Sequence, residues 1–226
     1  MLRLLIAVLL LVLAAPSAAV AAGSHKIAQE VARTVQLPRR AINFWWLPVD
    51  YWEEVARELK WKPEDVSAVR EKMSVYFVIA VLDATITADK KFSFAEHAGI
   101  AEKLEVRIGG GEPLPPLRQV DPVVTRQLPE LAYPLTTSLG PLAPGLRLLL
   151  VANTDEAGKP RIHGATPAII RARYQTGEEK PIELFWHTPL SSVASPRSDP
   201  KTGEPLEASW RFNPWTGEKL PQAPSR

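Results

Sequence analysis

The chain has 226 residues, 22 prolines, 12 glycines and no cysteine, and its 27 basic and 25 acidic residues give a formal net charge of +2. So balanced a charge gives no indication of nucleic-acid binding. The lack of cysteine excludes disulfides, cysteine nucleophiles and an N-terminal lipid anchor of the lipoprotein type, and the many prolines favour short elements with ordered connections.

The first residues have the layout of a cleavable export signal. Arg3 is followed by an apolar run over 4–15, a Pro16-Ser17 break and small residues that end in Ala-Val-Ala-Ala. An apolar run of about a dozen residues is short for a membrane span, which needs about 20. We therefore expect a signal peptide over 1–22, cleaved after Ala21 or Ala22, and a periplasmic or secreted protein without a stable transmembrane span. The alternative is an uncleaved N-terminal anchor.

Residues 23–73 are expected to form a helical N-terminal segment. A weakly helical pattern runs over 27–35 and stops before Pro38. Two stronger helices follow over 48–59 and 63–73, each with a proline suited to its first turn and apolar residues at helical spacing. Because each of these helices has one apolar face, the pair is expected to cover a core.

The β-rich core domain is expected over 74–190, packed with 23–73 as one unit. Val75–Leu82 is apolar on both faces, which is typical of a central strand that is covered on both sides. Further strands are expected over 103–108, 146–153, 168–174 and 181–190, and the third of these alternates, with Arg171 and Arg173 on one face. A short, proline-broken helix should begin after Asp121. These elements predict an α+β fold with a mostly antiparallel sheet or sandwich core.

Residues 191–226 are expected to form a proline-rich linker and a hairpin. The frame x-P-x-T-G-E-x-L occurs here twice, at 199–206 and at 213–220. Asp199, Thr202, Asn213 and Thr216 occupy the positions of the four cysteines in a pair of C-P-x-C-G turns. The segment therefore resembles a zinc ribbon that has lost all four ligands, and as a whole the chain resembles exported bacterial proteins of unknown function that end in such a tail.

The resemblance implies a metal-free, ribbon-like β-hairpin, because structural zinc takes thiolate or imidazole ligands and these positions offer one carboxylate at most. Asp199 and Asn213 are expected to hold each turn by accepting N–H groups two or three residues on, and Gly203 and Gly217 to supply a positive φ. The alternative is a pair of common turns in a disordered tail.

Two groups of aromatic residues are candidate binding residues. Trp210 and Trp215 are large apolar side chains, which are not expected in a tail that makes no contacts. Trp45, Trp46 and Trp52 could stack on sugar rings or anchor the protein at a membrane surface. The alternative for the second group is that these side chains fix a helix to its sheet.

The chain has no G-x-S-x-G, H-E-x-x-H or P-loop motif, and His25, His97, His163 and His187 are scattered singly. We predict no catalytic residue, metal or cofactor, and favour a non-catalytic interaction protein whose partner is another envelope protein or a cell-wall glycan. The alternative is an envelope-acting hydrolase or glycan-binding module, with a site assembled from histidines and carboxylates. A concave polar cleft that contains at least two of His97, His163, His187 and nearby carboxylates would favour the enzyme.

Overall fold

The computed structural model describes residues 23–177, 180–194, 197–199, 201–207 and 210–220. The predicted signal peptide, residues 1–22, lies outside these described residues. The helices are α2 (Gly23–Val31), α3 (Val49–Glu58), α4 (Pro63–Ser74), α5 (His97–Ala101), α6 (Pro122–Leu131), α7 (Tyr133–Leu139) and the 3₁₀ helix η1 (Gly140–Gly145). The strands are β1 (Ala32–Leu37), β2 (Arg40–Leu47), β3 (Tyr76–Ile86), β4 (Phe92–Phe94), β5 (Leu104–Ile108), β6 (Leu146–Ala152), β7 (Ala168–Tyr174), β8 (Ile182–Thr188), β9 (Arg197–Ser198) and β10 (Pro205–Leu206).

The larger sheet has five antiparallel strands, and β3 is its centre. β3 pairs with β2 along one edge and with both β4 and β6 along the other, and β1 completes the sheet beside β2. From Phe77 to Ala84 every residue of β3 is buried, as its apolar sequence predicts for a strand that is covered on both faces.

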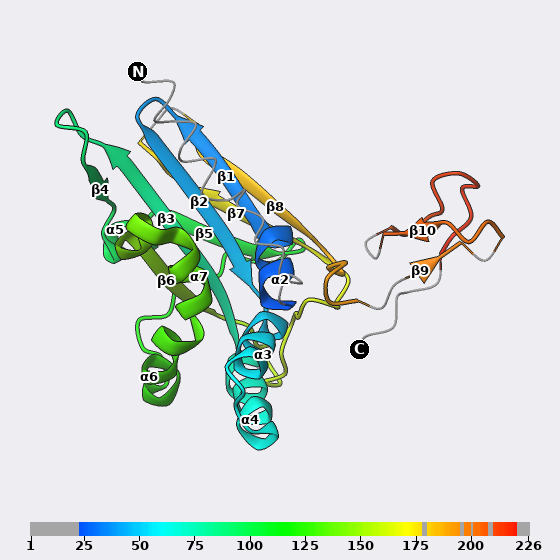
Figure 1. Cartoon of the computed structure of the whole chain (residues 1–226). Helices are drawn as coiled ribbons and strands as arrows, with labels where there is room; N and C mark the ends of the chain where they lie inside the picture. The colour runs from blue at the N-terminus through cyan, green and yellow to red at the C-terminus, as the bar shows by residue number, and fades with distance from the viewer. Residues whose placement is uncertain (1–22, 178–179, 195–196, 200, 208–209, 221–226) are drawn as a thin grey trace.

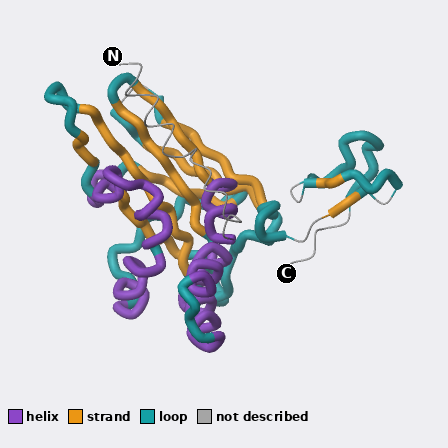
Figure 2. Tube along the Cα trace, viewed as in Figure 1, coloured by secondary structure: helices purple, strands orange, loops and turns teal. Residues whose placement is uncertain are grey.

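A smaller sheet, in the order β5-β7-β8, packs on one face of the larger one. In Figure 1 its strands lie behind β1 and β2, whereas α5 and α7 lie in front of the larger sheet. Figure 2 shows the same three layers by type of structure. The Phe44 and Tyr174 rings meet edge to face, 5.4 Å apart, and the Trp186 indole N–H donates to the Val31 carbonyl at 2.6 Å. The core therefore has two sheets, and helices cover the open side of the larger one.

The antiparallel α+β fold with covering helices is confirmed. α3 begins directly after Pro48 and α4 begins at Pro63, as predicted. Asp121 caps α6 by accepting the Val123 N–H at 2.7 Å.

The helical pattern predicted over 27–35 is wrong beyond Val31. Residues 32–47 form the hairpin β1–β2, which turns at Arg39 with a φ of 61°. β2 pairs with β3 along its whole length, so sheet hydrogen bonds and burial outweigh a weak local helical preference. This hairpin makes 23–73 part of the sheet as well as its cover.

Candidate functional site

The N-terminal aromatic residues belong to the core. Trp45, Trp46 and Trp52 are only 2%, 1% and 0% exposed. Trp46 stacks on Phe77 of the central strand with ring centres 5.5 Å apart, and the Trp52 indole N–H donates to the Leu47 carbonyl at 3.2 Å. Side chains buried this deeply cannot contact a glycan, membrane or protein in this fold, so the alternative interpretation, packing of helix against sheet, holds for all three.

The tail forms two matching turns, residues 199–204 and 213–218, which we call the double turn. In the first, the Asp199 carboxylate accepts the N–H groups of Lys201 at 2.7 Å and Thr202 at 3.2 Å. In the second, the Asn213 side-chain oxygen accepts those of Trp215 at 2.9 Å and Thr216 at 3.2 Å. The hydrogen bonds expected of these two side chains are thus present.

The remaining bonds of the double turn repeat in the same way. The N–H of Gly203 donates to the Asp199 carbonyl and that of Gly217 to the Asn213 carbonyl, each at 2.8 Å, and the two glycines have φ values of 73° and 71°. A side chain at either glycine would be strained at such a φ. Thr202 and Thr216 each accept an N–H two residues on, at 3.3 Å.

Direct contacts join the two turns. The Asn213 side-chain amide donates to the Asp199 carboxylate, and both residues are buried, at 3% and 2% exposed. On the surface, Lys201 pairs with Glu218 at 2.7 Å. The Asp199 carboxylate, the Asn213 amide and the Lys201–Glu218 pair therefore hold the two turns together.

Exposed aromatic surface lies on the second turn and directly before it. Phe212 and Trp215 are 57% and 56% exposed, and the Trp215 ring meets that of Trp210 edge-on with centres 5.8 Å apart. A surface aromatic held beside a hydrogen-bonded turn loses little further freedom when it binds, which favours a contact role. Of the five tryptophans predicted as binding residues, Trp210 and Trp215 lie on the tail rather than in the core.

The first turn should respond to acid through Asp199. Its hydrogen bonds, first that from the Lys201 N–H and then those from Asn213 and Thr202, lower the Asp199 pKa. A lowered pKa stabilises the turn above the ordinary carboxyl value of about 3.9, and this stabilisation is lost as the pH falls through the folded value.

In an NMR titration from pH 6 to pH 2, the Lys201 and Thr202 amide signals should therefore shift with a midpoint below about 3.9. The amides of Trp215 and Thr216 are a matched internal control, because their acceptor Asn213 does not titrate, and they should shift less. Asp199→Asn should abolish the titration. An ordinary aspartate midpoint at Lys201 would contradict the hydrogen bonding described here.

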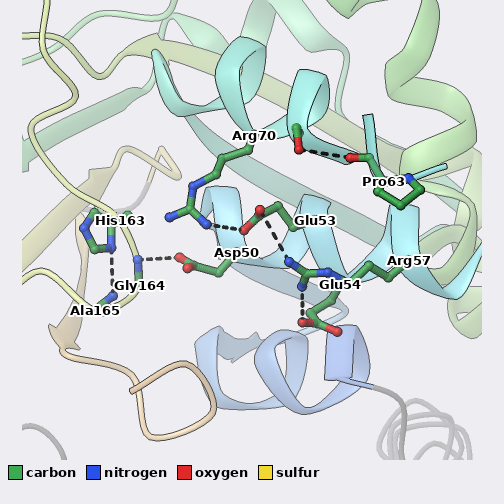
Figure 3. A network of polar contacts seen from close by, with 10 residues as sticks. Asp50, Glu53, Glu54, Arg57, Pro63, Arg70, His163, Gly164 and Ala165 are labelled. Carbon is green, nitrogen blue, oxygen red and sulfur yellow. Dashed lines mark hydrogen bonds and ion pairs between the residues drawn. The ribbon is translucent and has the colours of Figure 1, made fainter. Parts of the chain in front are cut away.

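A polar cleft of about 390 Å³ lies elsewhere, between α2, α3, α4, the loop 163–165 and the turn 191–193. At its centre Glu53, 6% exposed, accepts from Arg70 at 2.8 Å and faces Arg57 at 3.5 Å (Figure 3). Arg57 also pairs with Glu54 at 2.5 Å. These charges neutralise one another, and the Glu53–Arg70 pair joins α3 to α4.

The loop 163–165 is hydrogen-bonded to α3. Asp50 accepts the Gly164 N–H at 2.7 Å, and a β-carbon at Gly164 would lie only 2.7 Å from that carboxylate oxygen. His163 accepts the Ala165 N–H on Nδ1 at 3.2 Å, so the neutral ring carries its proton on Nε2 (Figure 3). No sequence signal indicates this cleft, because its residues come from five separate segments.

The cleft contains one of the three histidines named for the enzyme hypothesis. His97 lies on α5 and contacts the Leu148 carbonyl at 3.2 Å, and His187 lies on the exposed face of β8. The cleft therefore groups one of these histidines, His163, with the carboxylates of Asp50 and Glu53, and His97 and His187 are not among its lining residues. Among the residues described, no group of three histidine, aspartate or glutamate side chains is arranged to hold a metal ion.

Along the described part of the chain, no helix combines the length and the apolar character that crossing a bilayer requires. No model of a known protein family and no curated protein sequence matches the chain. A solved structure, the crystal structure of a novel protein of unknown function from Burkholderia pseudomallei K96243, is similar with a TM-score of 0.32 and 8% identity, over 72% of this chain and 82% of that chain. A likeness this weak carries no argument about function.

Proposed function

We propose that the protein is exported and non-catalytic, and that it binds another envelope protein through the aromatic surface of its double turn. The observation that carries this proposal is the exposure of Trp215, in the second turn, and of Phe212, directly before that turn, where hydrogen bonds to the Asn213 side chain fix the backbone. Exposed aromatic residues with little freedom to lose are the usual anchors of protein interfaces. The export signal predicted from the sequence of residues 1–22 supports the envelope as the compartment.

A protein partner fits the double turn better than a sugar does. The indoles of Trp215 and Trp210 are inclined at 75°, so they do not form one flat platform on which a sugar ring could stack. The Lys201–Glu218 pair offers polar groups of both signs, as the rim of a protein interface does. A glycan partner would be recognised by a change in tryptophan fluorescence when cell-wall fragments are added.

The proposal is tested by crosslinking the purified mature protein to partners in native envelope extracts. The double variant Phe212→Ser/Trp215→Ser should lose the partner that the unaltered protein captures. Phe185→Ser/Tyr133→Ser is the matched control, because these two aromatics are 43% and 61% exposed outside the tail. Equal capture by the tail variant and the unaltered protein would refute the proposal, as would loss in the control alone.

A further inference from the structure

The outer face of the smaller sheet carries a cluster of arginines that the proposed function does not use. The strands β5 and β7 alternate, so that Val106 and Ala172 point into the core while Arg107, Arg171 and Arg173 lie on the opposite face. Ile169 and Phe185, 46% and 43% exposed, lie on the same outer face. This face is therefore open, basic and partly apolar.

The pairing register brings like charges together. Arg107 of β5 lies directly opposite Arg171 of β7. Side chains opposite one another on antiparallel strands have β-carbons about 5 Å apart, and like charges in that arrangement destabilise a sheet. Hydrophobic packing of the inner face fixes the register, but it does not require an arginine at either outer position.

Two glutamates neutralise part of this charge. Glu105 accepts from Nε of Arg107 at 2.8 Å, and Glu183 accepts from Nε of Arg171 at 2.7 Å. Glu105 lies on the same strand as Arg107, whereas Glu183 lies on β8, the strand next to that of Arg171. Each glutamate binds its arginine on the Nε side of the guanidinium. Among the described residues, no partner is bound to the Nη1 group of either arginine.

Arg173 is the third member of the cluster. It lies opposite Glu105 on one side and Glu183 on the other, yet both glutamates are bound to the neighbouring arginines. Within the described residues Arg173 makes no hydrogen bond or ion pair, and it is exposed. Its five N–H donors are therefore available to a ligand.

These groups line a single hollow. A depression of about 200 Å³ is bounded by Glu105, Arg107, Arg171 and Arg173. We propose that this hollow binds the phosphate group of a phosphate-bearing ligand. The three guanidinium groups and the carboxylates of Glu105 and Glu183 give this cluster a net charge of +1, which attracts the charge of about −1.5 to −2 on a phosphate monoester.

Phosphate fits this arrangement better than a carboxylate does. A carboxylate has two oxygens, which one guanidinium can bind completely in a two-pronged contact. A phosphate monoester presents three acceptor oxygens and can engage donors from several arginines at once. A bound phosphate would also relieve the repulsion between Arg107 and Arg171, so binding should raise the melting temperature.

The test is calorimetric titration of the mature protein with inorganic phosphate at constant ionic strength, with acetate as the carboxylate comparison. Phosphate should bind more tightly than acetate and raise the melting temperature. Arg173→Gln should weaken phosphate binding about tenfold or more, the loss of one charge-assisted contact. Because Arg173 makes no hydrogen bond or ion pair with the described residues, this variant should keep its folded circular dichroism spectrum. Arg126→Gln on α6, an exposed arginine far from the hollow in sequence, should bind as the unaltered protein does.

A second measurement distinguishes the source of the phosphate group. If the natural ligand is a membrane lipid, phosphatidic acid vesicles should bind the protein and Arg173→Gln should reduce that binding, whereas phosphatidylcholine vesicles should not bind. If inorganic phosphate binds and these vesicles do not, the ligand is a soluble phosphate compound. Lack of phosphate binding to the protein, or equal weakening by Arg126→Gln and Arg173→Gln, would overturn the proposal.

Discussion

Trp46→Ala is expected to lower the free energy of unfolding by about 3–5 kcal/mol, the usual cost of truncating a buried tryptophan. The Trp46 ring is 1% exposed and stacks on Phe77 at an angle of 12°. Its removal leaves a cavity between the strands β2 and β3 and the smaller sheet, where tight packing leaves little room for collapse. Urea unfolding followed by circular dichroism measures the change.

The control is a second tryptophan. Trp215→Ala removes a ring that is 56% exposed, and it should change the free energy of unfolding by less than about 0.5 kcal/mol. A similar, small effect for both variants would mean that Trp46 is not a core residue. The comparison thus separates a tryptophan that holds the fold from one that is available for binding.

Asp83→Ala is expected to cost about 3 kcal/mol, at the low end of the range for breaking a buried ion pair. Asp83 is 2% exposed and accepts from Nε and Nη2 of Arg40 at 2.7 and 2.5 Å and from the Tyr174 hydroxyl at 2.7 Å. Its loss leaves the Arg40 cation without its partner, although that side chain keeps 20% exposure.

The pKa shifts of its partners agree with this role. The hydrogen bond to Asp83 raises the pKa of Arg40 and so keeps the guanidinium charged. Burial, and after it the bond to Asp83, raises the pKa of Tyr174, so the hydroxyl stays protonated as a donor. Asp83 thus ties β2 and β3 of one sheet to β7 of the other.

Urea unfolding of Asp83→Ala is compared with that of Asp89→Ala. Asp89 also pairs with a cation, Lys91 at 2.9 Å, but both side chains are more than half exposed. Exposed ion pairs of this kind contribute little to the free energy of unfolding, so the Asp89 variant should unfold at the same urea concentration as the unaltered protein. Equal effects of the two substitutions would contradict the account of Asp83 as the link between the sheets.

The sequence predicted well those features that local residue pattern determines. The alternation of 168–174 placed Arg171 and Arg173 correctly on one face, and the apolar run of β3 identified the central strand. The double turn was predicted down to its side-chain acceptors, because a Pro-x-Thr-Gly turn after Asp or Asn has few ways to satisfy its backbone.

Features that depend on pairing between distant segments could not be predicted in this way. The hairpin β1–β2 was missed because residues 41–47 are buried on both faces, and such a run has no alternation to distinguish a strand from a helix. Burial of Trp45 and Trp46 follows from the same pairing with β3. The cleft around Glu53 was missed because it joins α2, α3, α4 and two distant loops.

The most direct test of the proposed function is site-specific photo-crosslinking in the native envelope, with p-benzoylphenylalanine in place of Trp215. We expect a covalent adduct with one envelope protein from this position, and none from the same probe at Phe185, which is 43% exposed on the smaller sheet. A probe at Trp215 that gives no adduct, or the same adduct at both positions, would contradict an interaction through the double turn.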